Sequence, residues 1–173
     1  PDYELIELLA EVGFIDIVLP FESAHQRIIT RWCSNKWQVD NIDVEGLVKA
    51  IKATGMRVAA NYMIGFPDES REEINTTIEF AQRNMDYGLD ATNFFLCMPL
   101  PGTPMFEHCI DNGQLPRDFN IDKMQWTRAN MVNTPVPPEE LEEIRQHAWE
   151  LTNRPEHKAN RRKMRVSGAA DGE

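Results

Sequence analysis

The sequence predicts an α/β fold made of consecutive parallel βα units. An amphipathic helix, a glycine and a short apolar run follow one another three times along the chain. The apolar runs are nearly continuous, which is typical of strands in parallel sheets. The chain has 173 residues, of which 42% are hydrophobic, so it is long enough to bury a sizeable core.

The predicted helices share one pattern. Their apolar residues recur at intervals of three and four, and a glycine follows where a left-handed residue commonly ends a helix. The stripes are Leu5, Leu8, Leu9 and Val12 before Gly13; Val44, Leu47, Val48 and Ile51 before Gly55; and Ile74, Ile78, Ala81 and Met85 before Gly88. Ser70 and Glu73 add a capping box at the start of the third helix.

The strands are predicted at residues 15–19, 58–64 and 91–97. Because the runs are mostly apolar rather than alternating, we expect strands buried on both faces of a sheet. Three strands make only a thin open sheet. Their missing neighbours must come from an upstream segment or from a second copy of the chain, and we favour the upstream segment.

After the third strand the pattern changes. Residues 98–104 hold three prolines and a glycine, which predicts a rigid turn. Helices are expected near residues 105–112 and over 138–152, the second with Leu141, Ile144, Ala148 and Leu151 on one face. We therefore predict βα units over residues 1–115, a helical extension over 116–155 and a basic, disordered tail over 156–173.

Composition restricts the function. Lys and Arg number 18 against 28 Asp and Glu, a net charge of −10, which disfavours nucleic acid as a partner. No apolar run reaches the roughly 18–20 residues that span a bilayer. Cys33, Cys97 and Cys109 have neither disulfide nor metal-site spacing, and the four histidines add none. We expect no metal ligand in this chain and a cytoplasmic location.

Ligands of parallel βα folds bind at the carboxyl ends of the strands, where three unusual segments lie. Glu22 follows the first strand and could accept hydrogen bonds from a vicinal diol, or it could cap the next helix. Ser23 is favoured as a cap. Gly65 permits close backbone approach or a plain turn, and Ile64 could pack on a flat base or in the core. Residues 99–104 could form a pocket wall.

Other polar and aromatic residues have simpler interpretations. Asp68 and Glu69 begin the third helix, where the helix dipole accounts for their charges. Trp126 and Trp149 are interpreted as packing residues.

The three segments, in this order and spacing, resemble the radical S-adenosylmethionine superfamily. They are residues 17–23 (IVLPFES), 61–70 (NYMIGFPDES) and 98–107 (MPLPGTPMFE), and the similarity covers roughly residues 1–152. The most similar subgroup also has an upstream cobalamin-binding domain. The resemblance implies a partial parallel (β/α) barrel, of which this chain is the C-terminal half, with a C-terminal helical extension.

The resemblance also implies cofactors. A four-iron, four-sulfur cluster, held by a C-x-x-x-C-x-x-C loop outside this chain, reduces S-adenosylmethionine and releases a 5′-deoxyadenosyl radical. Methyl transfer is a further reaction of the cobalamin subgroup. The implied nucleoside contacts are Glu22 and Ser23 on the ribose side, Ile64, Gly65 and Phe66 near the adenine, and Met98 and Pro99 at a later strand end. No catalytic residue is assigned.

The chain departs from the family pattern at four positions. Pro20 and Ala24 stand where glycine is common, and Asp68 and Ser70 replace the glycine and threonine of the Pro-Gly-Glu-Thr loop. These departures weaken the adenine-side assignments more than that of Glu22.

Two other functions remain open. A non-catalytic half-barrel could dimerise through its exposed sheet edge or dock on a partner. An acid–base barrel enzyme would need a positioned histidine or carboxylate pair, for which the strand ends offer only Glu22, Asp68 and Glu69.

Overall fold

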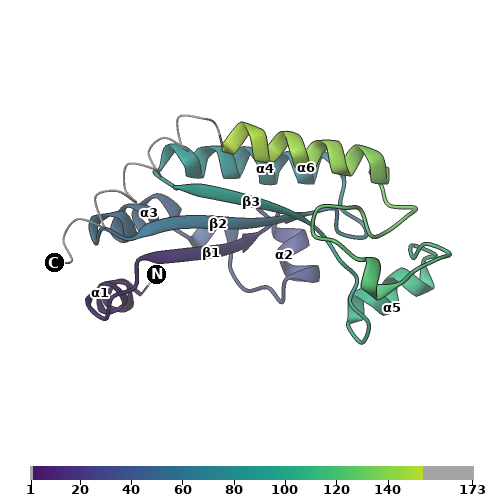
Figure 1. Cartoon of the computed structure of the whole chain (residues 1–173), viewed down its shortest axis with the longest axis horizontal. Coiled ribbons are helices and arrows are strands. Elements are labelled where there is room, and N and C mark those ends of the chain that lie inside the picture. Colours follow the sequence, from purple (N-terminus) through teal and green to yellow (C-terminus); the bar gives the residue numbers. More distant parts are fainter. Residues whose placement is uncertain (1, 154–173) are drawn as a thin grey trace.

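The computed structural model describes residues 2–153 (Figure 1), so the predicted tail over 156–173 lies outside the described residues. The helices and strands alternate largely as the sequence predicts. In chain order they are α1 (Tyr3–Glu11), β1 (Asp16–Glu22), α2 (Gln26–Trp32), the 3₁₀ turn η1 (Val39–Asn41), α3 (Val44–Ala53), β2 (Arg57–Ile64), α4 (Arg71–Asp86), β3 (Ala91–Leu96), α5 (Pro104–Asp111), the 3₁₀ turn η2 (Ile121–Lys123) and α6 (Pro138–Thr152).

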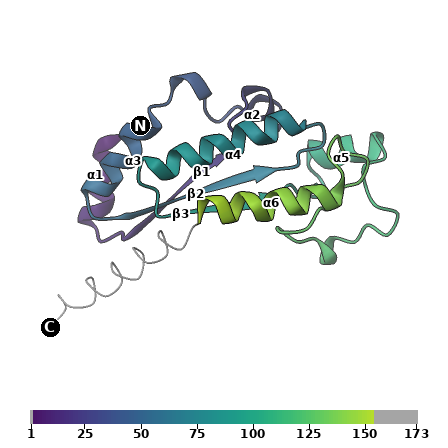
Figure 2. The ribbon, with the colours of Figure 1, turned by 90° about the horizontal axis from the view of Figure 1, so that it is seen from above.

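The three strands form a parallel sheet in the order β1-β2-β3, which confirms the α/β class. Ile17 of β1 lies opposite Val58 of β2, and Asn61 of β2 lies opposite Asn93 of β3. Helices α4 and α6 lie side by side over one face of this sheet (Figure 2). The strands all point toward the end of the molecule that carries α2 and α5 (Figure 1).

The expectation that the strands are buried on both faces is wrong for the described structure. Strand β2 alternates strictly: Val58, Ala60, Tyr62 and Ile64 are buried, and the residues between them are half-buried. The buried set meets the helices, whereas the other set faces away from them. The second face also carries apolar and small residues, so the run appeared continuously apolar in the sequence. Alanine and methionine occur on covered and uncovered faces alike and therefore do not indicate which face is buried. We call this second face the open face.

The helix starts and stops follow local chemistry. The Ser70 side chain accepts a hydrogen bond from the Glu73 N–H, and the Glu73 carboxylate accepts one from the Ser70 N–H, so the predicted capping box is confirmed. The stripes of α3 and α4 face the main core, together with Leu141, Ile144 and Ala148 of α6.

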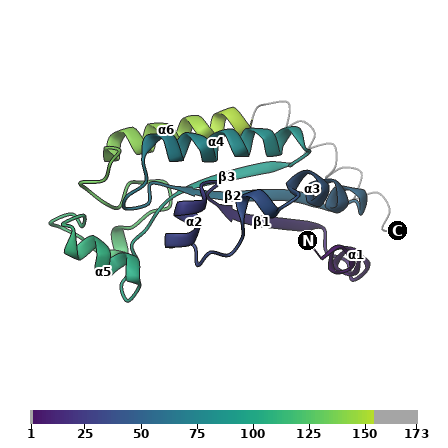
Figure 3. The same cartoon turned by 180° about the vertical axis from the view of Figure 1, so that it is seen from behind.

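Most of the apolar stripe of α1 does not face this core, although Leu9 packs against its edge. Leu5, Leu8 and Val12 are 49%, 54% and 64% exposed, and the buried residue of the helix is Ile6. Figure 3 shows α1 at the amino end of β1, apart from α4 and α6. The helix was predicted correctly, but its periodicity does not say which element would cover it.

A smaller cluster of buried residues lies at the carboxyl end of the sheet. It joins Ile28, Phe66, Cys97, Cys109 and Met131 beneath α2 and α5. Trp126, interpreted above as a packing residue, is 52% exposed. Among residues 2–153, no helix combines the length and apolar character needed to cross a bilayer.

Candidate functional site

The three predicted segments meet at one edge of the sheet. Glu22 pairs with Tyr62 across β1 and β2, and Ile64 pairs with Leu96 across β2 and β3. The Cys97 N–H donates to the Ile64 carbonyl at 3.0 Å and so extends the ladder to the last segment. The carboxyl ends of neighbouring parallel strands coincide, which explains why distant segments converge here.

Glu22 stands out at this edge because of its backbone. Its φ is +63°, a left-handed conformation, and the β1–β2 register shifts between Pro20 and Glu22. Such a conformation costs a non-glycine residue about 1–3 kcal/mol and is common at functional sites. The Trp37 indole donates to the Phe21 carbonyl at 2.9 Å, which secures the bulged segment.

The Glu22 carboxylate stays accessible. Its side chain is 23% exposed, and its Oε1 accepts from the Lys36 ammonium at 2.9 Å. The carboxylate therefore keeps oxygen lone pairs that could accept from ligand hydroxyls. It accepts no hydrogen bond from the N–H groups at the start of α2, so the observed geometry does not include the capping role considered for it.

Ser23 is fully buried, and its hydroxyl has structural partners. Its Oγ accepts from the His25 N–H at 3.1 Å and lies 3.3 Å from the Thr77 hydroxyl of α4. The Ala24 N–H also donates to Thr77 Oγ1, at 3.1 Å. These bonds fasten the end of β1 to α4. They do not cap α2, because the residue before that helix is His25 and no side chain caps its first N–H groups.

The turn after β2 is held by a buried carboxylate. Glu69 is 1% exposed, and its Oε2 accepts from the N–H groups of Gly65 and Phe66 at 2.7 and 3.1 Å. Its Oε1 has no partner among the described residues. Burial raises the pKa of Glu69 to about 8, against the two backbone hydrogen bonds that favour ionisation.

Gly65 is required at this turn for two reasons. Its φ is +76°, and a Cβ there would lie 3.2 Å from Leu141 Cδ1 of α6. The side that the missing Cβ would occupy therefore faces α6. The Ile64 and Phe66 side chains are 0% and 2% exposed, so both occupy core positions. A ligand at this turn would meet backbone rather than these side chains.

Arg27 of α2 ties the strand-end loops together. Its guanidinium donates to both oxygens of Glu73 at 2.6 Å and to Asp68 Oδ2 at 2.8 Å. The Trp32 indole donates to Asp68 Oδ1 at 2.7 Å. The hydrogen bonds from Arg27 lower the pKa of Glu73 to about 2. The start of α4 is thus fixed beside α2.

The last segment brings sulfur atoms to the same end. Met98 is half-buried and Pro99 is buried. Cys97 Sγ lies 3.3 Å from Met105 Sδ, and Cys109 Sγ lies 3.4 Å from Met131 Sδ. Burial raises the pKa of the Cys109 thiol to about 11 and that of Cys97 well above its usual value. These thiols are neutral packing groups.

The described residues do not form a metal-binding cluster. No group of three or more His, Cys, Asp or Glu side chains within residues 2–153 could hold a metal ion. The cysteines of this chain therefore do not fit an iron–sulfur cluster, which needs ionised thiolates from several cysteines.

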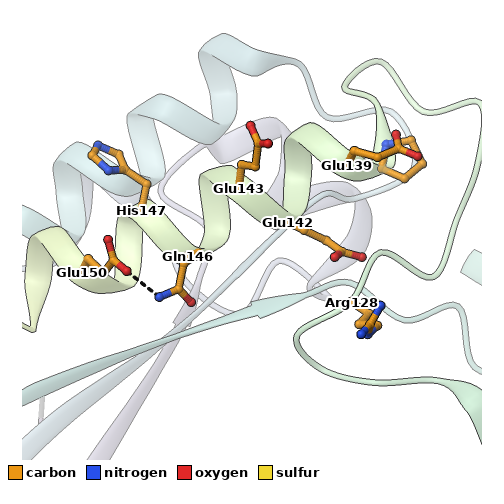
Figure 4. A pocket seen from close by; sticks show the side chains of 8 residues that line it. Arg128, Glu139, Glu142, Glu143, Gln146, His147 and Glu150 are labelled. Carbon is orange, nitrogen blue, oxygen red and sulfur yellow. Dashed lines mark hydrogen bonds between the residues drawn. The ribbon is translucent and has the colours of Figure 1, made fainter.

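A shallow groove lies elsewhere, along α6. Figure 4 shows Glu139, Glu142, Glu143, Gln146, His147 and Glu150 of α6 with Arg128 beside them. Gln146 donates to Glu150 at 2.7 Å within the helix. The groove contains none of the predicted site residues, and we interpret it as a solvated helix surface.

Several residues at the strand ends were missed by sequence reasoning. Lys36 and Arg27 carry no motif, because their partners lie 14 and 41–46 residues away. Glu69 was noticed but explained by the helix dipole. Its place four residues after a glycine at a strand end could have indicated a turn-binding carboxylate, since such turns leave backbone N–H groups unpaired.

Comparison with known proteins points to methyl-transferring enzymes. No family model matches the chain. An uncharacterized methyltransferase of Pyrococcus horikoshii is 32% identical over 112 residues, which are 65% of this chain and 23% of that protein. Cytidylyl-2-hydroxyethylphosphonate methyltransferase of Streptomyces wedmorensis is 25% identical over 140 residues, 78% of this chain and 25% of the enzyme.

A third relative is named as a synthase rather than as a methyltransferase. The tRNA-2-methylthio-N(6)-dimethylallyladenosine synthase of Thermus thermophilus is 27% identical over 128 residues, 70% of this chain and 25% of the enzyme. The chain thus spans about a quarter of the length of these curated relatives. It is similar to parts of enzymes, which include methyltransferases and this synthase.

Proposed function

We propose that this chain is part of a radical S-adenosylmethionine enzyme and supplies the nucleoside-binding side of its active site. The observation that carries the proposal is the accessible Glu22 carboxylate on a strained strand end, beside the turn at Gly65. A carboxylate in this position can accept both hydroxyls of a ribose. The similarity to methyltransferases and to a methylthio-adenosine synthase supports an enzyme that uses S-adenosylmethionine.

The residues present fit S-adenosylmethionine but not the iron–sulfur cluster. The accessible Glu22 carboxylate offers the hydrogen-bond acceptors that the ribose of a nucleoside needs. Cys97 and Cys109 are buried, Cys33 is half-buried, and no group of three or more His, Cys, Asp or Glu side chains within residues 2–153 could hold a metal ion, so the proposal puts the cluster-binding cysteines outside this chain. When bound, the reduced cluster and S-adenosylmethionine would supply a carbon radical that removes a substrate hydrogen. In the subgroup that the chain resembles, a bound cobalamin would supply methyl-transfer chemistry.

The two edges of the sheet support a partial barrel that continues beside β1. The outer edge of β3 is covered: Asn153 bonds both backbone groups of Thr92, Arg145 donates to the Phe94 carbonyl, and the Leu96 N–H donates to the Trp126 carbonyl. A covered edge does not recruit another strand.

The β1 side differs from the β3 side. Within residues 2–153, seven of the eleven exposed large hydrophobic residues belong to the first 18 positions: Tyr3, Leu5, Leu8, Val12, Phe14, Ile15 and Val18. An apolar surface of this kind marks an interface. We propose that upstream strands of the same barrel pair with β1 and cover α1. The free cysteines support a cytoplasmic, reducing setting.

The first test uses the full-length protein. Glu22→Gln should weaken S-adenosylmethionine binding about tenfold or more, because a hydrogen bond to a charged group contributes about 1.5–3 kcal/mol. Glu45→Gln is the matched control, since Glu45 pairs with Lys49 on the surface of α3. Isothermal titration under anaerobic conditions measures both. Unchanged affinity in Glu22→Gln removes the ribose assignment.

A second observation bears on the dimerising half-barrel. The exposed β1 side would serve a second copy of the chain as well as an upstream strand. Light scattering on the full-length protein, together with the sequence of that protein, distinguishes the enzyme from the dimerising module. A C-x-x-x-C-x-x-C loop ahead of Pro1 supports the enzyme. A gene that lacks such a loop, with a symmetric dimer closed across β1, supports the module.

A further inference from the structure

The open face of the sheet carries an unusual pair of amides. Asn61 of β2 and Asn93 of β3 are register partners, so their side chains stand next to each other on the face away from α4 and α6. Asn93 Nδ2 donates to Asn61 Oδ1 at 2.9 Å. Asn93 is exposed and Asn61 is half-buried, so a ligand can reach both.

The pair leaves hydrogen-bonding capacity unused. Each carboxamide has one amino group and one carbonyl oxygen. After the mutual bond, the Asn61 amino group and the Asn93 oxygen have no partner among the described residues. Exchanging oxygen and nitrogen in both amides gives the same result, one free donor and one free acceptor side by side. The backbones of the two strands run about 5 Å apart, so both amides can contact one ligand.

An aromatic surface adjoins the amides. Phe95 is the next β3 residue on the open face, and its ring centroid lies 5.6 Å from that of Trp126 at an angle of 65°. The Leu96 N–H donates to the Trp126 carbonyl at 2.8 Å, which fixes the Trp126 segment along β3. With 52% of its surface exposed, Trp126 offers an indole face on which a flat ring can stack.

The geometry points to a binding subsite for a planar amino-heterocycle, such as the adenine or cytosine of a nucleoside substrate. The exocyclic amine of the base would donate to Asn93, a ring nitrogen would accept from Asn61, and the ring would stack on Trp126. A single asparagine recognises adenine by accepting from its exocyclic amine and donating to a ring nitrogen. Here the acceptor and the donor come from two neighbouring asparagines.

The chemistry of the face disfavours other occupants. An aliphatic ligand would bury two unpaired amide groups at a cost of about 1–3 kcal/mol each. No ionised side chain belongs to the pair, so recognition does not select for a charged group. The inference deepens the proposed function, because in a barrel the open face lines the interior where a substrate would lie.

This subsite is distinct from the proposed cofactor contacts. Asn61 pairs with Pro20, two residues before Glu22, and it points to the open face, whereas the Ile64 side chain points to the helices. A nucleoside substrate would thus lie deeper along the strands than the ribose carboxylate. The acidic net charge of −10 favours a small nucleoside or nucleotide over a polynucleotide.

The test uses full-length protein saturated with S-adenosylhomocysteine, so that the cofactor position is filled. Adenosine, cytidine and purine riboside, which lacks the exocyclic amine, are the probes, and saturation-transfer NMR measures binding. We expect adenosine or cytidine to bind at least tenfold more tightly than purine riboside. This comparison needs no variant. Equal binding of all three probes overturns the inference, and so does binding of the probes to the free protein that disappears when S-adenosylhomocysteine saturates it.

Variants then assign the residues. Asn61→Ala and Asn93→Ala should each weaken the preferred nucleoside about tenfold or more and leave S-adenosylmethionine affinity unchanged. Asn41→Ala, an exposed asparagine of η1, is the control. Loss of cofactor affinity in Glu22→Gln with intact nucleoside binding separates the two proposals. A nucleoside affinity that is unchanged in both Asn61→Ala and Asn93→Ala contradicts the subsite.

Discussion

Glu69→Gln tests whether the buried carboxyl at the β2 turn is protonated in the folded protein. Glu69 is 1% exposed, and burial raises its pKa to about 8 from the usual 4.5. Between these values the folded chain holds a proton that the unfolded chain has released. Stability therefore falls as pH rises through this window.

The size of the effect follows from the two pKa values. Each pH unit in this window corresponds to about 1.4 kcal/mol, so wild type should lose about 4 kcal/mol between pH 5 and pH 8 relative to a variant that does not titrate. Glutamine can still accept from the Gly65 and Phe66 N–H groups. Its amino group would replace the unpartnered Oε1, at a cost of about 1–3 kcal/mol. Wild type should thus be the more stable protein at pH 5 and the less stable one at pH 8.

Urea unfolding followed by circular dichroism at pH 5, 6, 7 and 8 measures this reversal. Glu72→Gln, at an exposed position three residues further on in the first turn of α4, serves as the control and should parallel wild type. A stability difference between Glu69→Gln and wild type that stays constant within about 0.5 kcal/mol from pH 5 to pH 8 would refute the assignment of a protonated carboxyl.

Two further perturbations use neighbouring or equivalent positions as controls. Gly65→Ala should cost about 2–4 kcal/mol in urea unfolding, from its φ of +76° and the contact with Leu141, whereas Gly55→Ala, at φ +84° with open space, should cost only about 1–2 kcal/mol. Equal losses of stability in the two variants would show that the Leu141 side chain moves aside without an energetic cost. Thr77→Val removes the acceptor of a buried N–H and should lower stability by about 1–3 kcal/mol, while exposed Thr76→Val should change it by less than about 0.5 kcal/mol in the same assay. A Thr77→Val melting curve that overlays wild type would contradict the anchoring of β1 to α4.

The strand-end site was predictable where it depends on the direction of the chain. Parallel βα units bring every strand end to one edge, so Glu22, Gly65 and Met98 could be grouped without coordinates. What each side chain does there could not be predicted in this way. Ser23 and Ile64 became buried because α4 packs over that end of the sheet. Glu22 remains accessible because of a β-bulge that no sequence pattern predicts.

The sequence by itself determined the order of the elements, the helix ends and the class of the sheet. These features depend on contacts within a few residues: an apolar stripe, a glycine with positive φ, or the reciprocal bonds of Ser70 and Glu73. Only the tertiary structure decided which faces are covered. The two strand faces, the exposed stripe of α1 and the amide pair of Asn61 and Asn93 all depend on partners more than 30 residues away or absent from the described residues. Local periodicity reports that a face is apolar, but register and packing decide what meets it.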